Sequence, residues 1–239
     1  SIVWCYRAAV SRRVRIGRHA IASQLVRTGV RSILIISIVS AAVGLILVLQ
    51  MSPPLADFNS EDLVANITGV AVTRELGPLI AAIVLTGFAG ASIAAEIGTM
   101  VVGEEIEALE AHALNPVRFL VVPRVMATIV SMTGLSVMAT AVAIFAGMAM
   151  GVFVLGITPE KYWANTLAQV GVVDFVTGTV KAAVFGLLIG LIACTNGLRV
   201  TGGAAGVGDA TTNTVWQSVV AIIIADLAFT AMFYALGLT

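Results

Sequence analysis

Four of the eight glutamates of this 239-residue chain fall within seven positions, and they form its densest cluster of reactive side chains: Glu104, Glu105, Glu107 and Glu110. Closely spaced carboxylates can act as general acid and base, and carboxylates with a nearby histidine, here His112, can hold a divalent metal ion. Neither chemistry is supported by the rest of the sequence, because no second cluster of His, Asp or Cys supplies further ligands. We therefore predict neither a catalytic carboxylate pair nor a metal site in this segment.

Residues 102–113 form an amphipathic helix when they are placed on a helical wheel. One apolar stripe is made by Val102, Ile106, Leu109 and Ala113, and it is flanked by Glu105 and Glu110. The pattern predicts a helix that Asn115 and Pro116 end. It is typical of a solvated acidic helix in a loop, or of a docking helix whose stripe enters a groove on a soluble, basic partner. A polytopic membrane protein commonly presents such a helix to an ATPase that transmits force to its spans.

The rest of the chain is strongly apolar and predicts an integral membrane protein. Hydrophobic residues make up 59% of the sequence, charged residues only 11%, and the mean hydropathy is +1.04. A soluble domain would carry about a quarter charged residues. The formal net charge is zero and gives no sign of a nucleic-acid partner. The two cysteines, Cys5 and Cys194, predict no disulfide framework.

Five uncharged runs predict about five transmembrane helices, since a span needs about twenty residues. The runs are Ser32–Ala56, Leu76–Ala95, Val125–Pro159, Ala182–Leu198 and Ala210–Thr239, the last interrupted only by Asp226. The third run has 35 residues, for which we predict one long, tilted helix and keep a hairpin as the alternative. Segments 52–75 and 158–179 are predicted to be loops outside the cell. The fold class is therefore an all-α transmembrane bundle.

The distribution of arginines predicts the orientation and the domain plan. Seven of the thirteen basic residues precede Ser32, so the N-terminus and the glutamate segment are predicted to be cytoplasmic and the C-terminus outside. Residues 1–31 are predicted to form a basic interfacial helix, with an ordinary positive flank as the alternative. Residues 32–239 form one transmembrane domain in this plan, and residues 99–115 are its cytoplasmic helix.

Three stretches carry a family resemblance: RELGPLIAAIVLTGFAGASIAAEIGTM, EEIEALEAHALNPVRFLVVPR and GGAAGVGDATTNTVWQSVVAIIIADLAFTAMF. They resemble the MlaE/YrbE permeases, the membrane subunits of ABC transporters that work with MCE proteins to move lipids, and the resemblance covers about residues 25–237. It implies a lipid permease of the inner (plasma) membrane. It also implies an interfacial N-terminal helix, five spans and a coupling helix between the second and third spans.

The resemblance also implies the partners. Two permease copies, in a homodimer or a heterodimer, would face each other around an outward-opening lipid cavity, with two cytoplasmic ABC ATPases and an outer ring of MCE proteins. The chain has no GxxxxGK[ST] phosphate loop. ATP and Mg²⁺ are therefore expected on the partner ATPase, and this chain is expected to have no cofactor and no enzyme activity of its own.

The same resemblance implies roles for particular residues. The coupling helix would be formed by Glu104, Glu105, Ile106, Leu109 and Glu110. The lipid site would lie at Arg74, Glu75 and Leu76, with wall residues Leu47, Leu55 and Phe58. On the residues alone, Arg74 and Glu75 at the outer end of the second span predict equally an ion pair that ends a helix and a contact to a lipid head group.

Three further positions are singled out. Phe88 stands where family members often carry arginine, which favours a more apolar substrate or a heteromeric partner that supplies the charge. Asp226 lies within the fifth span, where we favour a hydrogen bond to a neighbouring helix over a proton relay. Glu96 is predicted to lie at the cytoplasmic interface and to cap the coupling segment.

Two other classes of protein remain as alternatives. A secondary transporter or channel driven by an ion gradient predicts inverted repeats, yet no repeat is visible and Asp226 is the one obvious mid-span ion ligand. A membrane scaffold would anchor outer subunits without transport, and the dependence of lipid movement on ATP separates it from a permease.

Overall fold

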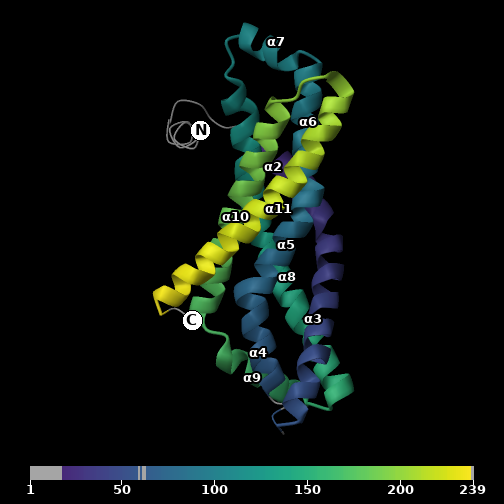
Figure 1. Cartoon of the computed structure of the whole chain (residues 1–239), viewed down its shortest axis with the longest axis vertical. Helices are drawn as coiled ribbons and strands as arrows, with labels where there is room; N and C mark the ends of the chain where they lie inside the picture. Colours follow the sequence, from purple (N-terminus) through teal and green to yellow (C-terminus); the bar gives the residue numbers. More distant parts are fainter. Residues whose placement is uncertain (1–17, 59, 61–62, 238–239) are drawn as a thin grey trace. The chain divides into compact units, whose positions relative to one another are not determined.

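The computed structural model describes residues 18–58, 60 and 63–237, with side chains from residue 22 onward. Residues 1–17, the larger part of the predicted interfacial helix, lie outside the described residues. Every described element is a helix (Figure 1). The elements are α2 (Arg18–Thr28), η1 (Val30–Ser32), α3 (Ile33–Ala56), α4 (Leu63–Ala71), η2 (Val72–Leu76), α5 (Gly77–Leu85), η3 (Thr86–Gly90), α6 (Ala91–Val102), α7 (Glu105–Ala111), η4 (Val117–Val121), α8 (Val122–Leu155), α9 (Pro159–Gln169), α10 (Val172–Leu198) and α11 (Gly203–Ala235).

Five helical stretches in the described part of the chain are long and apolar enough to cross a membrane, as predicted. They are Ala22–Ala56, Leu63–Val102, Val117–Leu155, Val172–Leu198 and Gly203–Ala235. Helix α8 runs unbroken for 34 residues. The long single helix predicted for the third span is therefore confirmed, and the hairpin alternative is wrong.

The second stretch is longer than the sequence predicted because it includes three charged residues, Arg74, Glu75 and Glu96. The predicted loop at 52–75 is wrong: α3 continues to Ala56, and helix resumes at Leu63 and runs through Arg74 and Glu75. The predicted loop at 158–179 likewise contains α9 and the start of α10. Uncharged runs underestimate these helices, since a charge that is paired with a neighbour is tolerated inside a span.

In the described part of the chain, three π-helical turns interrupt the regular helices. η2 and η3 lie within the second stretch, and η4 begins the third. A π turn shifts the side chains that follow it around the helix, and such turns occur frequently at functional sites. η2 carries Arg74 and Glu75, and η3 carries Phe88. Positions that the sequence singled out thus lie on irregular helix.

The helices pack as two compact units. Among the described residues, the first unit comprises those up to Ser32, 83–132 and 183–225, and the second comprises those within 33–82, 133–182 and from Asp226 onward. The first unit has a buried apolar cluster of Ile93, Ile97, Val121, Val125, Ala193 and Cys194. Glycines bring its helices close together, because a Cβ on Gly197 would lie only 2.8 Å from the Cβ of Ile97.

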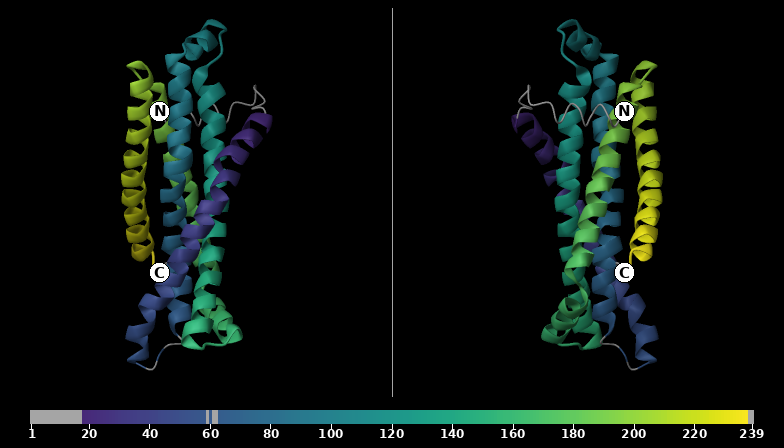
Figure 2. Two further views of the ribbon diagram at one scale, coloured as in Figure 1. Left: turned by 90° about the vertical axis from the view of Figure 1, so that its right-hand side faces the viewer. Right: turned by 90° about the vertical axis from the view of Figure 1, so that its left-hand side faces the viewer.

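The second unit also depends on glycine contacts between helices. Gly44 of α3 lies so close to α8 that an added Cβ would overlap the carbonyl oxygen of Ala143. At one end of the unit α4 packs along α9 (Figure 2). There Tyr162 is buried against Ala65 and Ile157. Burial raises the pKa of the Tyr162 phenol to about 12.

Helix α7 links α6 to η4 (Figure 1) and ends earlier than predicted. The Leu114 N–H donates to the Leu109 carbonyl at 3.0 Å, and the Ala113 N–H donates to the Glu110 carbonyl at 2.9 Å. With Ala113 in the left-handed region at φ 58°, this is a Schellman motif. The helix is therefore ended by its own backbone hydrogen bonds.

Asn115 and Pro116, which were predicted to end this helix, start the next one. The Asn115 Oδ1 accepts a hydrogen bond from the Arg118 N–H at 3.2 Å, which is an N-cap contact. Pro116 then takes the first helical position, where a missing N–H costs nothing.

We predict that Gly44→Ala destabilises the chain by about 1–3 kcal/mol, because the new methyl group forces α3 away from α8. Gly134→Ala in α8 is the matched control, since no atom lies within 4 Å of a Cβ at Gly134. It is expected to be neutral or slightly stabilising. Thermal unfolding in detergent measures both, and equal unfolding temperatures for the two variants would contradict the packing described here.

Candidate functional site

A network of five charged side chains lies within the second unit. Lys181 of α10 is 1% exposed. Its ammonium lies 2.5 Å from Glu75 Oε2 and 3.0 Å from Asp226 Oδ1. The guanidinium of Arg74 forms an ion pair with Asp174. Each basic side chain of the network thus has a carboxylate partner, and the network joins η2, α10 and α11.

Thr230 and Phe233 complete the surroundings of Lys181. Lys181 Nζ donates to the Thr230 hydroxyl at 2.9 Å, and this hydroxyl lies 3.0 Å from Glu75 Oε1. The ammonium also lies 5.9 Å from the centre of the Phe233 ring, within the range of a cation–π interaction. The three N–H donors of the ammonium thus have three facing oxygens, from Glu75, Asp226 and Thr230. This arrangement holds the charge in one position.

Asp174 contacts both the start of α10 and Arg74 of the network. Its Oδ2 accepts a hydrogen bond from the backbone N–H of Gly171 at 2.7 Å, three residues earlier. An acidic residue in the first helical turn that reaches back in this way stabilises the helix start. Its other oxygen, Oδ1, pairs with Arg74. The same carboxylate therefore fixes where α10 begins and where Arg74 lies.

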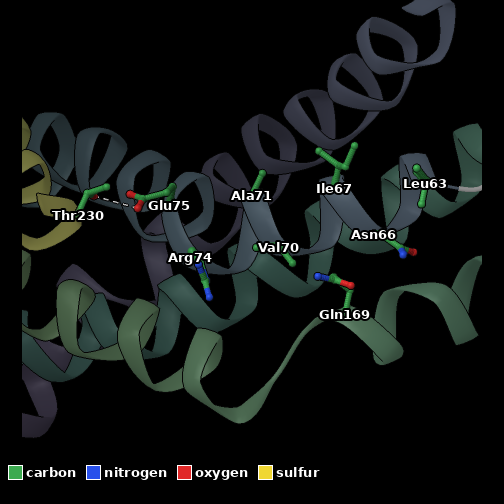
Figure 3. Close-up of a pocket in the computed structure, with 9 residues that line it drawn as sticks. All are labelled: Leu63, Asn66, Ile67, Val70, Ala71, Arg74, Glu75, Gln169 and Thr230. Carbon is green, nitrogen blue, oxygen red and sulfur yellow. Dashed lines mark hydrogen bonds between the residues drawn. The ribbon is translucent and has the colours of Figure 1, made fainter. Parts of the chain in front are cut away.

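A pocket of about 560 Å³ lies beside this network, wholly within the second unit. It is lined by Leu63, Asn66, Ile67, Val70, Ala71, Arg74, Glu75, Gln169 and Thr230 (Figure 3). Figure 3 shows Glu75 and Thr230 at one end, while Ile67 and Val70 of α4 supply an apolar wall. The pocket therefore combines charged groups with an apolar surface, as an amphipathic ligand requires.

Two of the six residues predicted for a lipid site, Arg74 and Glu75, line this pocket. The other four are not among its lining residues: Leu47, Leu55 and Leu76 are half-buried and Phe58 is 77% exposed. Their contact with lipid stays a prediction.

Asp226 forms an ion pair with Lys181 of the neighbouring helix α10, whose ammonium lies 3.0 Å from Oδ1, where a hydrogen bond to a neighbouring helix was expected. Sequence reasoning missed Lys181 and Asp174. A signal for them exists, because these two charges stand seven residues apart and hence on one face of an otherwise apolar helix.

Glu96 does not cap the coupling segment, so that prediction is wrong. Its two carboxylate oxygens bind arginines of the first unit instead: Oε1 pairs with Arg27, and Oε2 lies 3.3 Å from Arg124. Helix α6 continues past Glu96 to Val102, so Glu96 lies within that helix and not at the start of α7. The residue before α7 is Glu104, which has a left-handed backbone and makes no capping hydrogen bond through its side chain.

Helix α7 presents its glutamates to the surroundings. Glu104, Glu105, Glu107 and Glu110 are all exposed, whereas Ile106 and Leu109 are half-buried, and no residue of the helix is fully buried. No group of three His, Cys, Asp or Glu within the described residues is arranged to hold a metal ion. The apolar stripe of α7 is thus only partly covered by its own chain.

Comparison with known proteins identifies relatives over most of the chain. The family model described as Permease MlaE matches residues 21–232. A probable ABC transporter permease protein of Rickettsia typhi is 35% identical over 211 residues, which cover 88% of this chain and 82% of the relative. The intermembrane phospholipid transport system permease protein MlaE of Haemophilus influenzae is 32% identical over 210 residues, 87% of this chain and 80% of the relative. The chloroplastic protein TRIGALACTOSYLDIACYLGLYCEROL 1 of Arabidopsis thaliana is 32% identical over 211 residues, 88% of this chain and 60% of the relative.

We predict that Lys181→Gln lowers the free energy of unfolding by about 3–5 kcal/mol, because Glu75 and Asp226 lose the cation between them. Lys161→Gln is the matched control, since Lys161 is the other lysine of the chain and is exposed on α9. Neutralising the partners as well, in Glu75→Gln with Lys181→Gln and Asp226→Asn, is expected to restore part of the loss. Thermal unfolding in detergent tests this, and equal stability of the Lys181 and Lys161 variants would refute the role of the network.

Proposed function

This chain belongs to the MlaE permease family, and from that premise we propose that it is the permease subunit of an ATP-driven ABC transporter that moves lipid between the membrane and MCE proteins. The observation that carries the proposal is the pocket in which Arg74 and Glu75 lie beside an apolar wall. The name of the Haemophilus relative, an intermembrane phospholipid transport permease, supports a phospholipid or a similar hydrophobic lipid as the cargo.

The pocket suits the polar end of a lipid. Arg74, Asn66 and Gln169 supply donors and acceptors, while Ile67 and Val70 contact the apolar part of the molecule. When all five groups of the network are ionised, two cations face three carboxylates. A purely anionic head group must therefore compete with Asp174 and Glu75 for the basic side chains. A head group that carries its own positive charge is accommodated without breaking an ion pair.

Helix α7 is proposed to couple this chain to an ATPase. Its half-buried Ile106 and Leu109 would enter a cleft on the ATPase, and exposed glutamates such as Glu105 and Glu110 would meet basic residues at the rim. α6 and η4 lead directly from this helix into the second and third spans. Movement of the ATPase would therefore shift these spans as rigid bodies.

The family resemblance supports a proposal for the remaining assembly. Two permease copies, identical or different, two cytoplasmic ABC ATPases that bind ATP and Mg²⁺, and an outer ring of MCE proteins are proposed as partners. The proposed location is the inner membrane, with the N-terminus and α7 cytoplasmic and the C-terminus outside.

A transporter driven by an ion gradient is the second candidate. It is favoured by one observation, the buried Lys181 between two carboxylates within membrane-spanning helices, because such groups often bind or relay ions. Lipid transfer by reconstituted complexes separates the two candidates. Transfer that requires ATP hydrolysis supports the ABC permease, and transfer that follows a proton or sodium gradient without ATP supports the second candidate.

We predict that Ala71→Trp, which fills the pocket without changing a charge, reduces both co-purified lipid and lipid transfer. Ala168→Trp is the matched control, because Ala168 is exposed on α9 and does not line the pocket. Mass spectrometry of the purified complex counts the lipid, and thermal unfolding verifies that both variants fold. Unchanged lipid retention and transfer in the Ala71 variant would exclude this pocket as the lipid site.

We predict that Leu109→Asp weakens binding of the ATPase by roughly tenfold or more, since a charge on the apolar stripe must be desolvated in the cleft. Leu167→Asp provides the same substitution at an exposed site on α9 and is expected to leave binding unchanged. Co-purification and ATPase activity are measured for both. An ATPase that stays attached and coupled in the Leu109 variant would rule out α7 as the coupling helix.

A further inference from the structure

The first unit holds a second, smaller cavity, where α2 and η1 face η3 and α6. Its volume is about 60 Å³, enough for about four water molecules or one small polar group. The residues that line it include Gln24, Arg27, Arg31, Phe88, Ser92 and Glu96. The cavity is distinct from the pocket of the second unit and shares no residue with it.

Positive charge is in excess around this cavity. Arg27 and Arg124 both pair with the single carboxylate Glu96, one on each of its oxygens. Arg31 also lines the cavity, and no described residue forms an ion pair or hydrogen bond with its guanidinium. Two guanidinium groups line the cavity and a third, that of Arg124, adjoins it through Glu96, the one carboxylate there. Arg27 and Arg31 are exposed, so an anion can reach them, and the excess of positive charge attracts it.

The cavity also offers hydrogen-bond donors that the protein does not use. The side chains of Gln24, Arg31 and Ser92 have no hydrogen-bond partner among the described residues. They supply amide, guanidinium and hydroxyl donors from different helices. A phosphate group takes several such donors at once, and guanidinium groups bind it in a two-pronged geometry.

An irregular helix and an exposed aromatic ring border the same cavity. The π turn η3 brings Phe88 to it, and Phe88 is 45% exposed. Val30, next to Arg31 in η1, is 57% exposed. The anion site therefore adjoins surface that is apolar enough to contact an acyl chain. A soluble anion has no apolar part that would contact this surface.

We propose that this cavity binds the head-group phosphate of an anionic membrane lipid, with Arg31 as its main ligand. Arg27 and Ser92 complete the site, and Phe88 contacts the lipid next to its head group. The proposal does not depend on the transport function, because it concerns a lipid held by the first unit and not the cargo in the pocket of the second unit.

The test is a lipid titration of the purified full-length chain in detergent, followed by its thermal unfolding. Dioleoyl-phosphatidylglycerol is compared with dioleoyl-phosphatidylcholine, which carries no net charge, and with sodium phosphate at matched ionic strength. We expect phosphatidylglycerol to stabilise the protein at concentrations about tenfold lower than phosphatidylcholine. Arg31→Gln is expected to raise the apparent Kd for phosphatidylglycerol by about tenfold.

Two variants control this experiment. Arg199→Gln removes the same charge from an exposed residue of the first unit that does not line the cavity, and it is expected to bind phosphatidylglycerol as the wild type does. Arg31→Lys keeps the charge and is expected to give intermediate affinity, and it replaces Arg31→Gln if that variant does not fold. Equal responses of the Arg31 and Arg199 variants, or equal affinity for both lipids, would overturn the proposal. Sodium phosphate acting as strongly as phosphatidylglycerol would overturn the assignment to a lipid.

Discussion

The ion pairs of Lys181 with Glu75 and Asp226 are the interaction on which the second unit depends. A buried ammonium in a membrane-spanning helix is tolerated only if oxygens surround it, and here two carboxylates and a hydroxyl do so. These contacts tie three helical elements together. They also allow the second stretch to continue as helix through Glu75. Without the partner charges, this span would have to begin at about Leu76, as the uncharged run predicted.

The π turns explain how a mostly regular bundle presents particular side chains to its two cavities. η2 carries Arg74 and Glu75 to the pocket of the second unit, and η3 carries Phe88 to the cavity of the first unit. Elsewhere, glycine contacts such as that of Gly44 hold helices at close distance. Such contacts limit the movement of one helix against the next, since packed helices have little freedom to adjust.

The sequence alone was sufficient to predict the features that depend on a local pattern of residues. Uncharged runs predicted five spans, the stripe of Ile106 and Leu109 predicted α7, and a family resemblance pointed to Arg74 and Glu75. Contacts between distant segments could not be predicted, because nothing near Lys181 in the sequence identifies Glu75, 106 residues away, as its partner. The same limit explains the error at Glu96, which binds arginines on other helices. The error at Asn115 has a local cause, because an Asn-Pro pair is found both after the end of a helix and at the start of one.

The two polar sites differ in the sign of their unbalanced charge, and this difference separates their proposed ligands. In the second unit two cations face three carboxylates, so both basic groups are already neutralised. In the first unit two arginines, Arg27 and Arg124, share Glu96, and Arg31, which lines the same cavity, has no partner among the described residues. Since charge complementarity governs selection among head groups of similar size, an anionic lipid is favoured at the first site. A head group with its own ammonium is favoured at the second. One lipid species is therefore not expected to fill both sites equally well.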